Sequence, residues 1–179
     1  HNTNPSPDPA YSRGFSFFLA LRPVLRYTPL ISCMSSTPFV SQYSPLLPPS
    51  WQPRACGIAA LTMLLGYWHT KNPALPAPDV RTILEHALAA DAYLQDVGWL
   101  HKGLVQTAAF FGYTGHHVET THQPEDEAWQ EFSNVVAAFP VLASVKSSFD
   151  PAKSGGHLVL VERVSEHEVE LLDPEESSA

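Results

Sequence analysis

Apolar residues recur every three or four positions between residues 55 and 138, a spacing typical of helices that bury one face. The run that begins at Cys56 is apolar on most sides, so it predicts a buried helix that ends before Pro73. Asp79 is a favourable residue to begin a second helix, whose inner face carries Val, Ile, Leu and Ala. Two further helices are expected over residues 99–111 and 124–138.

The spacing changes after residue 138, where short segments rich in Val and Leu alternate with polar turns. Such segments are typical of strands, which are expected at 140–147, 157–164 and 168–173. The residues "SEH" at 165–167 are expected to turn a hairpin between the last two strands. Helices that precede an antiparallel sheet predict an α+β fold, with the helical part packed on a C-terminal sheet.

Residues 1–36 are dense in proline and serine, so we expect an irregular N-terminal segment followed by one domain over 37–179. A chain of 179 residues is long enough for one sizeable core. The apolar run "GFSFFLAL" at 14–21 is too short to span a bilayer and is not followed by a clear signal-peptide cleavage site. No membrane span is therefore expected, and the compartment stays open.

Charge and motifs argue against several classes of partner. The chain has 10 Lys and Arg against 18 Asp and Glu, a net charge of −8, whereas a nucleic-acid binder needs a basic face. It contains no GxxxxGK[ST] phosphate loop, so ATP is not an expected ligand. Cys33 and Cys56 are too few for a zinc site, and the histidines lack HExxH spacing, so no metal or other cofactor is expected.

Cys56 stands at the start of the first predicted helix, directly before a glycine. Unpaired backbone N–H groups and the positive end of the helix dipole favour a thiolate there, and the thiolate is the nucleophilic form. Gly57 has no side chain, which suggests that a substrate backbone could approach the sulfur closely. Free cysteines are also among the most buried residues, so an inert core thiol is the alternative interpretation of Cys56 alone.

His157 is distinctive among the nine histidines because it follows two glycines and opens a predicted strand. The hairpin at 165–167 should return Asp173 beside it, where the carboxylate could accept a bond from Nδ1–H and fix the imidazole tautomer. A plain Asp-Pro turn is the alternative interpretation of Asp173. The remaining histidines considered are interpreted as incidental or exposed to solvent: His69, His86, His101, His116, His117 and His122.

Acyl transfer also needs hydrogen-bond donors for the oxyanion, and the backbone N–H of Cys56 can supply one. Two glutamines are candidates for the second donor. Gln52 in "WQPRACG" is nearer in sequence, while Gln42 in "PFVSQY" ends a short segment that could be a strand.

The segments "ACGIAALTMLLGYW" and "GGHLVLVERVSEHEVELLDP" together resemble the papain-like cysteine peptidases of family thirty-nine. The best-known members remove double-glycine leader peptides inside bacteriocin export transporters. The similarity covers residues 37–174 and includes "PFVSQY", which resembles the family's short opening strand. By position, the resemblance implies Cys56 as the nucleophile, His157 as the general base and acid, and Asp173 as the residue that orients the imidazole.

The resemblance also bears on the oxyanion glutamine and on the extent of the domain. Transporter members carry this glutamine six residues before the cysteine, where this chain has Ser50. Free-standing members carry it in the opening strand, which points to Gln42 and leaves Gln52 as the alternative. The absence of transmembrane and ATP-binding segments implies a stand-alone relative. Such domains usually continue beyond the Asp with another strand or two, so either a truncated C-terminal end or a short sheet is expected.

These observations predict a cysteine peptidase that hydrolyses peptide bonds in a peptide or protein substrate through an acyl-enzyme. One alternative keeps the same triad but acts as an amidase or transferase. Another is a catalytically silent papain-like module that binds peptides, and a third is a structural domain with an inert thiol.

Overall fold

The computed structural model describes residues 17–23 as backbone, together with 37–150, 152, 155–165 and 167–176. Its helices follow the predicted pattern closely. They are α2 (Cys56–Lys71), α3 (Val80–Ala89), α4 (His101–Phe110) and α5 (Glu125–Val136), with short 3-10 helices η1 (Gln52–Arg54) and η2 (Ser147–Phe149). Within the described residues, no helix has both the length and the apolar character needed to cross a membrane.

A five-stranded antiparallel sheet has the strand order β4-β1-β5-β6-β7. Its strands are β1 (Phe17–Pro23), β4 (Tyr113–Glu119), β5 (Val141–Lys146), β6 (Gly156–Val164) and β7 (Val169–Leu172). A separate two-stranded hairpin joins β2 (Tyr93–Leu94) to β3 (Gly98–Trp99). The predicted α+β class is therefore confirmed, and so is the hairpin between β6 and β7, where Ser165 N–H donates to Glu168 O at 2.8 Å.

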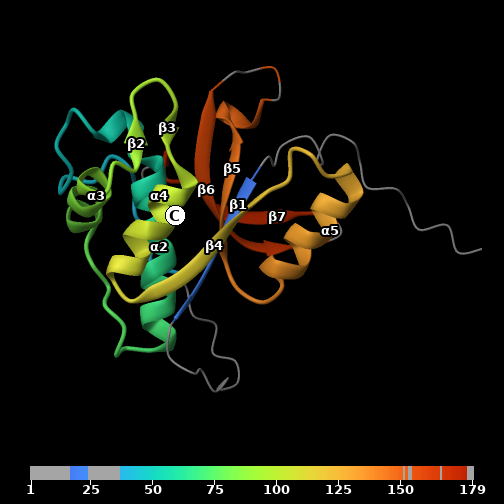
Figure 1. Ribbon diagram of the computed structural model, residues 1–179, viewed down its shortest axis with the longest axis horizontal. Helices are drawn as coiled ribbons and strands as arrows, with labels where there is room; N and C mark the ends of the chain where they lie inside the picture. The colour runs from blue at the N-terminus through green and yellow to red at the C-terminus, as the bar shows by residue number, and fades with distance from the viewer. Residues whose placement is uncertain (1–16, 24–36, 151, 153–154, 166, 177–179) are drawn as a thin grey trace, which may run out of the picture.

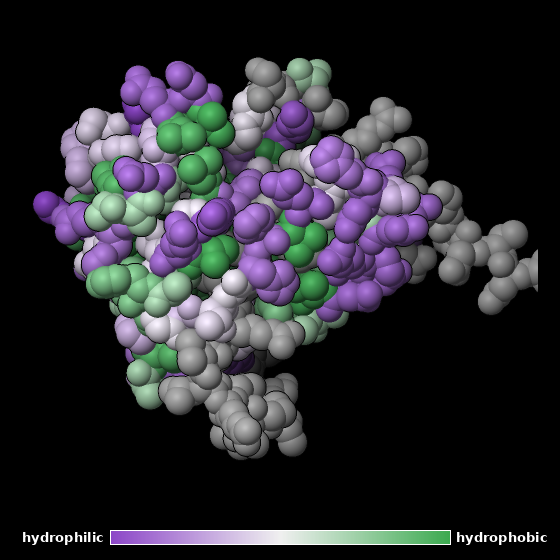
Figure 2. Space-filling view, viewed as in Figure 1, coloured by the Kyte–Doolittle hydropathy of each residue, from purple (hydrophilic) through white to green (hydrophobic). Residues whose placement is uncertain are grey.

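Both faces of the central sheet are covered by helices. Figure 1 shows α2, α3 and α4 on one side of the sheet and α5 on the other. Residues 157–161 of β6 are all buried in succession, as expected for a strand packed on both faces. The outer face of α5 is hydrophilic (Figure 2), and its first turn carries the exposed acidic residues Glu125, Asp126 and Glu127, which suit the positive end of the helix dipole.

The N-terminal segment differs from the expectation at residues 17–23, which form β1 between β4 and β5. The prolines and serines that suggested an irregular segment lie around this stretch. The sequence "FFLALRP" is itself rich in aromatic and aliphatic residues, a composition that permits a strand once two neighbouring strands supply hydrogen bonds. Residues 1–16 and 24–36, including Cys33, lie outside the described residues.

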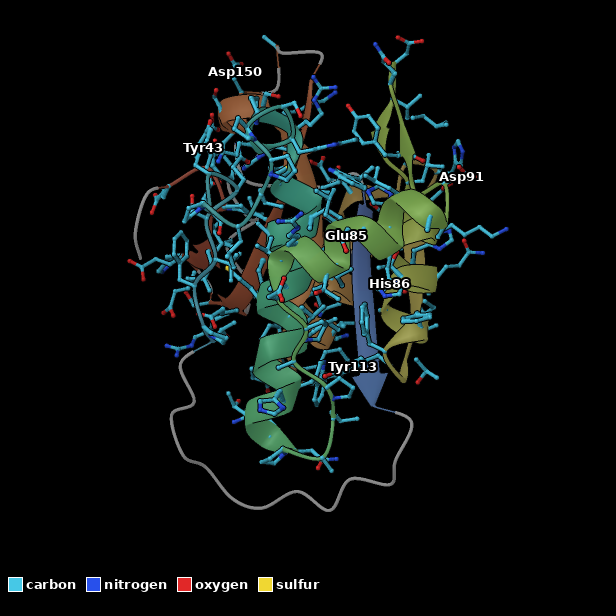
Figure 3. All side chains as sticks on the ribbon, turned by 90° about the vertical axis from the view of Figure 1, so that its left-hand side faces the viewer. Tyr43, Glu85, His86, Asp91, Tyr113 and Asp150 are labelled. Atoms are coloured by element: carbon cyan, nitrogen blue, oxygen red, sulfur yellow. The ribbon has the colours of Figure 1, made fainter. Side chains whose placement is uncertain are left out.

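Tyr113 connects the start of β4 to the helical layer. Its side chain, labelled in Figure 3, is 1% exposed, and its hydroxyl donates to Pro76 O at 2.7 Å and lies 3.2 Å from Leu65 O. Burial raises the pKa of this hydroxyl to about 12, so it remains a neutral donor throughout the physiological range. The carbonyl of Leu65 belongs to α2, and this contact therefore ties β4 to the central helix.

Asp79 caps α3 as the sequence suggests, since its carboxylate accepts from the N–H groups of Arg81 and Thr82 at 2.9 Å each. Asp79→Ala should lower the free energy of unfolding by about 1 kcal/mol, as measured by urea denaturation. Asp96→Ala, at an exposed position before β3, is the matched control and should change it by less than about 0.5 kcal/mol. Equal losses in the two variants would contradict the capping role.

Candidate active site

A cleft of about 820 Å³ lies between the start of α2, the β2–β3 hairpin and the main sheet. In Figure 1, the β2–β3 hairpin and η2 both lie toward the top of the view. The cleft lining includes Gln42, Cys56, Trp99, His101, His117 and His157. Residues from the helical part and residues from the C-terminal sheet therefore line the same cleft.

Cys56 is the first residue of α2, and its side chain is partly exposed in the cleft. The preceding residue, Ala55, caps the helix without a side-chain hydrogen bond, so the first N–H groups of α2 remain near the thiol. This placement differs from the fully buried position expected of an inert core thiol.

His157 and Asp173 form a close pair beside Cys56. The imidazole Nε2 lies 2.6 Å from Asp173 Oδ1, and the two side chains are only 10% and 14% exposed. The same Oδ1 accepts from the backbone N–H of Glu175 at 2.9 Å, which helps to fix the carboxylate. The structure therefore brings together the three residues named from the sequence.

The pair differs from the expectation in the ring nitrogen that it uses. Asp173 contacts Nε2 rather than Nδ1, so Nδ1 is the ring nitrogen that this carboxylate leaves for other partners. Leu172 pairs with Leu160, so Asp173 lies diagonally from His157 along the hairpin rather than directly opposite it.

The environment of His157 favours the imidazolium. Burial acts to lower its pKa, but hydrogen bonds to Cys56 and Asp173, together with the charges of both groups, raise it from 6.5 to about 9. Because the pKa rises on folding, protonation of His157 stabilises the fold fully below pH 6.5. That contribution is lost as the pH rises through about 9.

The two candidate glutamines occupy different environments. Gln42 is 4% exposed and lines the cleft, and its Oε1 is buried without a hydrogen-bond partner among the residues that the structure describes. Gln52 Nε2 is bound to the carbonyls of Ser44 at 3.2 Å and Leu47 at 3.5 Å, outside the cleft lining. Of the two glutamines, Gln42 is therefore the one that lines the cleft. The segment before it forms no strand: residues 37–41 are irregular and a turn begins at Gln42.

Gly57 has a different role from the one expected. A Cβ at this position would lie 2.8 Å from Trp99 Cδ1 and 2.9 Å from Leu158 Cδ1. The space beside Gly57 is therefore filled by the protein's own side chains, and close packing, rather than substrate access, accounts for the glycine.

Two histidines that sequence reasoning set aside also line the cleft, namely His101 at the start of α4 and His117 on β4. Burial lowers the pKa of His101 to about 4, with a smaller contribution from the charge of His117. No local sequence signal predicts the position of His117, because the pairing of β4 with the distant strand β1 brings it to the cleft. By contrast, His69 Nδ1 contacts Leu75 O at 2.7 Å and His86 stacks on Phe110, both outside the cleft lining.

No cluster of three or more His, Cys, Asp or Glu side chains suited to a metal ion occurs in the described part of the chain. The charged side chains that line the cleft carry both signs: Arg54, Lys102, Glu119 and Glu175. What distinguishes the cleft chemically is the partly exposed thiol next to a buried imidazole–carboxylate pair.

The fold is that of a papain-like α+β protein. More narrowly, the chain belongs to the Peptidase_C39 like family, whose family model matches residues 34–179. Searches of curated proteins and of solved structures found no match. The resemblance seen in the sequence is thus confirmed at the level of the family, and β1 lies before the matched region.

Asp173→Asn tests the cause of the raised His157 pKa. The amide keeps the shape of the carboxylate but removes its charge, so the pKa should fall from about 9 toward 6.5, and the imidazolium should lose its proton at lower pH. An NMR titration of the His157 ring measures this. Glu170→Gln on β7, which alters an exposed ion pair with Arg163, is the matched control. An unchanged titration in Asp173→Asn would exclude the carboxylate as a cause.

Proposed function

We propose that the protein is a cysteine peptidase that hydrolyses peptide bonds with Cys56 as nucleophile, His157 as general base and acid, and Asp173 as the group that orients the imidazole. The observation that carries the proposal is the 2.6 Å contact between His157 Nε2 and Asp173, made by the same imidazole that hydrogen-bonds the Cys56 side chain at a helix N-terminus. A thiolate–imidazolium pair in a cleft is the starting state for such a nucleophile.

The reaction proceeds in two halves. The Cys56 thiolate attacks the peptide carbonyl carbon, and the Cys56 N–H and the Gln42 side-chain amide donate to the oxyanion. The tetrahedral intermediate collapses with cleavage of the C–N bond, and His157 gives its proton to the departing amine. A water molecule then attacks the thioester, with His157 taking one of its protons. Collapse of the second intermediate releases a carboxylic acid and regenerates the thiolate.

Three observations support this scheme over the alternatives. Partial exposure of Cys56 argues against an inert core thiol, and an intact Cys56–His157–Asp173 arrangement argues against a silent module. The family match supports a peptide or protein as the substrate. An amidase or transferase that acts on other amides would use the same three residues. The narrower bacteriocin-processing type stays a prediction of the sequence resemblance.

The nucleophile is tested by the rate at which iodoacetamide alkylates Cys56 between pH 4 and 9, with peptide mass spectrometry separating Cys56 from Cys33. Fast labelling well below pH ~8.5, the free-thiol pKa, is expected in the wild type and should be lost in His157→Ala. His122→Ala, an exposed change before α5, is the control and should label like the wild type. A Cys56 that stays unlabelled, or labels as an ordinary thiol in every variant, would exclude the peptidase.

The choice between glutamines is tested by turnover of a fluorogenic peptide library. Gln42→Ala should lower kcat by about 100-fold with little change in KM, because its amide acts on the oxyanion and not on the ground state. Alkylation of Cys56 should remain fast in this variant, since no oxyanion forms. Gln52→Ala removes an amide that holds a turn and should keep most of kcat. The opposite ranking of the two variants would assign the role to Gln52.

A further inference from the structure

Trp99 joins the β2–β3 hairpin to the turn that leads into the nucleophile helix. It is the last residue of β3, its side chain is 7% exposed, and it also lines the cleft. Its indole Nε1–H donates to the backbone carbonyl of Arg54 at 2.6 Å. This bond bridges 45 residues of sequence and ends two residues before Cys56.

The carbonyl of Arg54 lies directly before the first turn of α2. The hydrogen-bond ladder of α2 begins one residue later, where Ala55 O accepts from Ala59 N–H at 2.9 Å. The Arg54–Ala55 peptide therefore lies just before the helix, and it is followed directly by the peptide whose N–H is the proposed oxyanion donor. Because the peptide is planar, a rotation of the Arg54 carbonyl turns the Ala55 N–H with it and changes the φ angle of Ala55, which leads into the peptide that carries the Cys56 N–H.

The indole ring is itself held on several sides. Its centroid lies 4.9 Å from that of Tyr93 and 5.9 Å from that of Trp51, and Trp51 and Tyr93 meet edge to face at 5.1 Å. On the helix side, the absent side chain of Gly57 leaves the ring its space. Packing therefore sets the direction of the indole N–H. A hydrogen-bond donor must be held in this way if it is to hold the Arg54 carbonyl in one orientation.

From these contacts we infer that Trp99 is a positioning residue for the nucleophile. Its N–H holds the Arg54 carbonyl, and it thereby fixes the directions of the Cys56 N–H and of the thiol toward His157. The inference rests on the proposed function, because it assigns Trp99 to the same site. It goes further by naming the β2–β3 hairpin as the element that sets the geometry of that site.

The chain supplies a matched control in Trp68. This residue is also 7% exposed, and its indole N–H is buried without a hydrogen-bond partner in the described part of the chain. Trp68→Phe and Trp99→Phe make the same chemical change in two buried rings. Only the second of these variants removes a hydrogen bond that leads to Cys56.

The test measures two quantities in full-length wild type, Trp99→Phe and Trp68→Phe: the pH profile of Cys56 alkylation and the kcat and KM of peptide turnover. Trp99→Phe should shift the acid limb of the alkylation profile to higher pH. It should also lower kcat by about tenfold with KM little changed, which is the effect of one buried hydrogen bond. Trp68→Phe should keep the wild-type profile and kcat. Melting temperatures establish that each variant is folded.

The outcomes separate the two proposals. If the wild type itself lacks fast alkylation at low pH, the proposed function fails. If the wild type has it and Trp99→Phe matches the wild type in profile and kcat, the positioning role fails while the proposed function stands. Equal losses of kcat in Trp99→Phe and Trp68→Phe would also overturn the positioning role, because general loosening of the core would explain them.

Gly57→Ala provides a second route that keeps the indole. Its added Cβ would lie 2.8 Å from Trp99 Cδ1 and 2.9 Å from Trp99 Cγ, as well as 2.9 Å from Leu158 Cδ1, so the indole ring must move relative to the turn. The same upward shift of the acid limb and the same fall in kcat are expected. This variant decides the matter if Trp99→Phe does not fold, and a folded Gly57→Ala with the wild-type profile would contradict the positioning role.

Discussion

The burial of α2 is the constraint on which the rest of the structure depends. Every residue from 57 to 66 is buried, because the sheet, α3 and α4 together enclose the helix. A helix buried in this way has few places where its backbone end can meet solvent, and its start opens into the cleft. Cys56 is the first, partly exposed residue of α2. Its position therefore follows from the packing of the residues behind it.

Direct packing also joins the nucleophile to its base. The residue after Cys56 is Gly57 and the residue after His157 is Leu158, and the Cβ position of Gly57 lies 2.9 Å from Leu158 Cδ1. The two functional side chains are thus each one residue from a tight contact between α2 and β6. Close-packed contacts resist small displacements, so this contact limits how far α2 and β6 can move relative to each other.

The sequence predicts those parts of the molecule that depend on local signals. Helix spacing places Cys56 at the start of α2, and the hairpin at 165–167 places Asp173 near His157. What it does not predict depends on long-range pairing or on ring orientation. Long-range pairing accounts for the entry of β1 into the sheet and for the position of His117 in the cleft. Ring orientation accounts for the contact between Asp173 and Nε2.

Asp173 shows why a structural and a functional interpretation of one residue need not compete. It does begin a turn, since Glu176 N–H donates to its carbonyl at 3.1 Å. Its side chain holds His157, and the carbonyl of the next residue, Pro174, accepts from Gln42 N–H at 2.8 Å. Two adjacent residues therefore fix both the base and the segment that carries the proposed oxyanion donor. Displacing the turn would move both groups together, and the plain Asp-Pro turn is thus part of the site's construction.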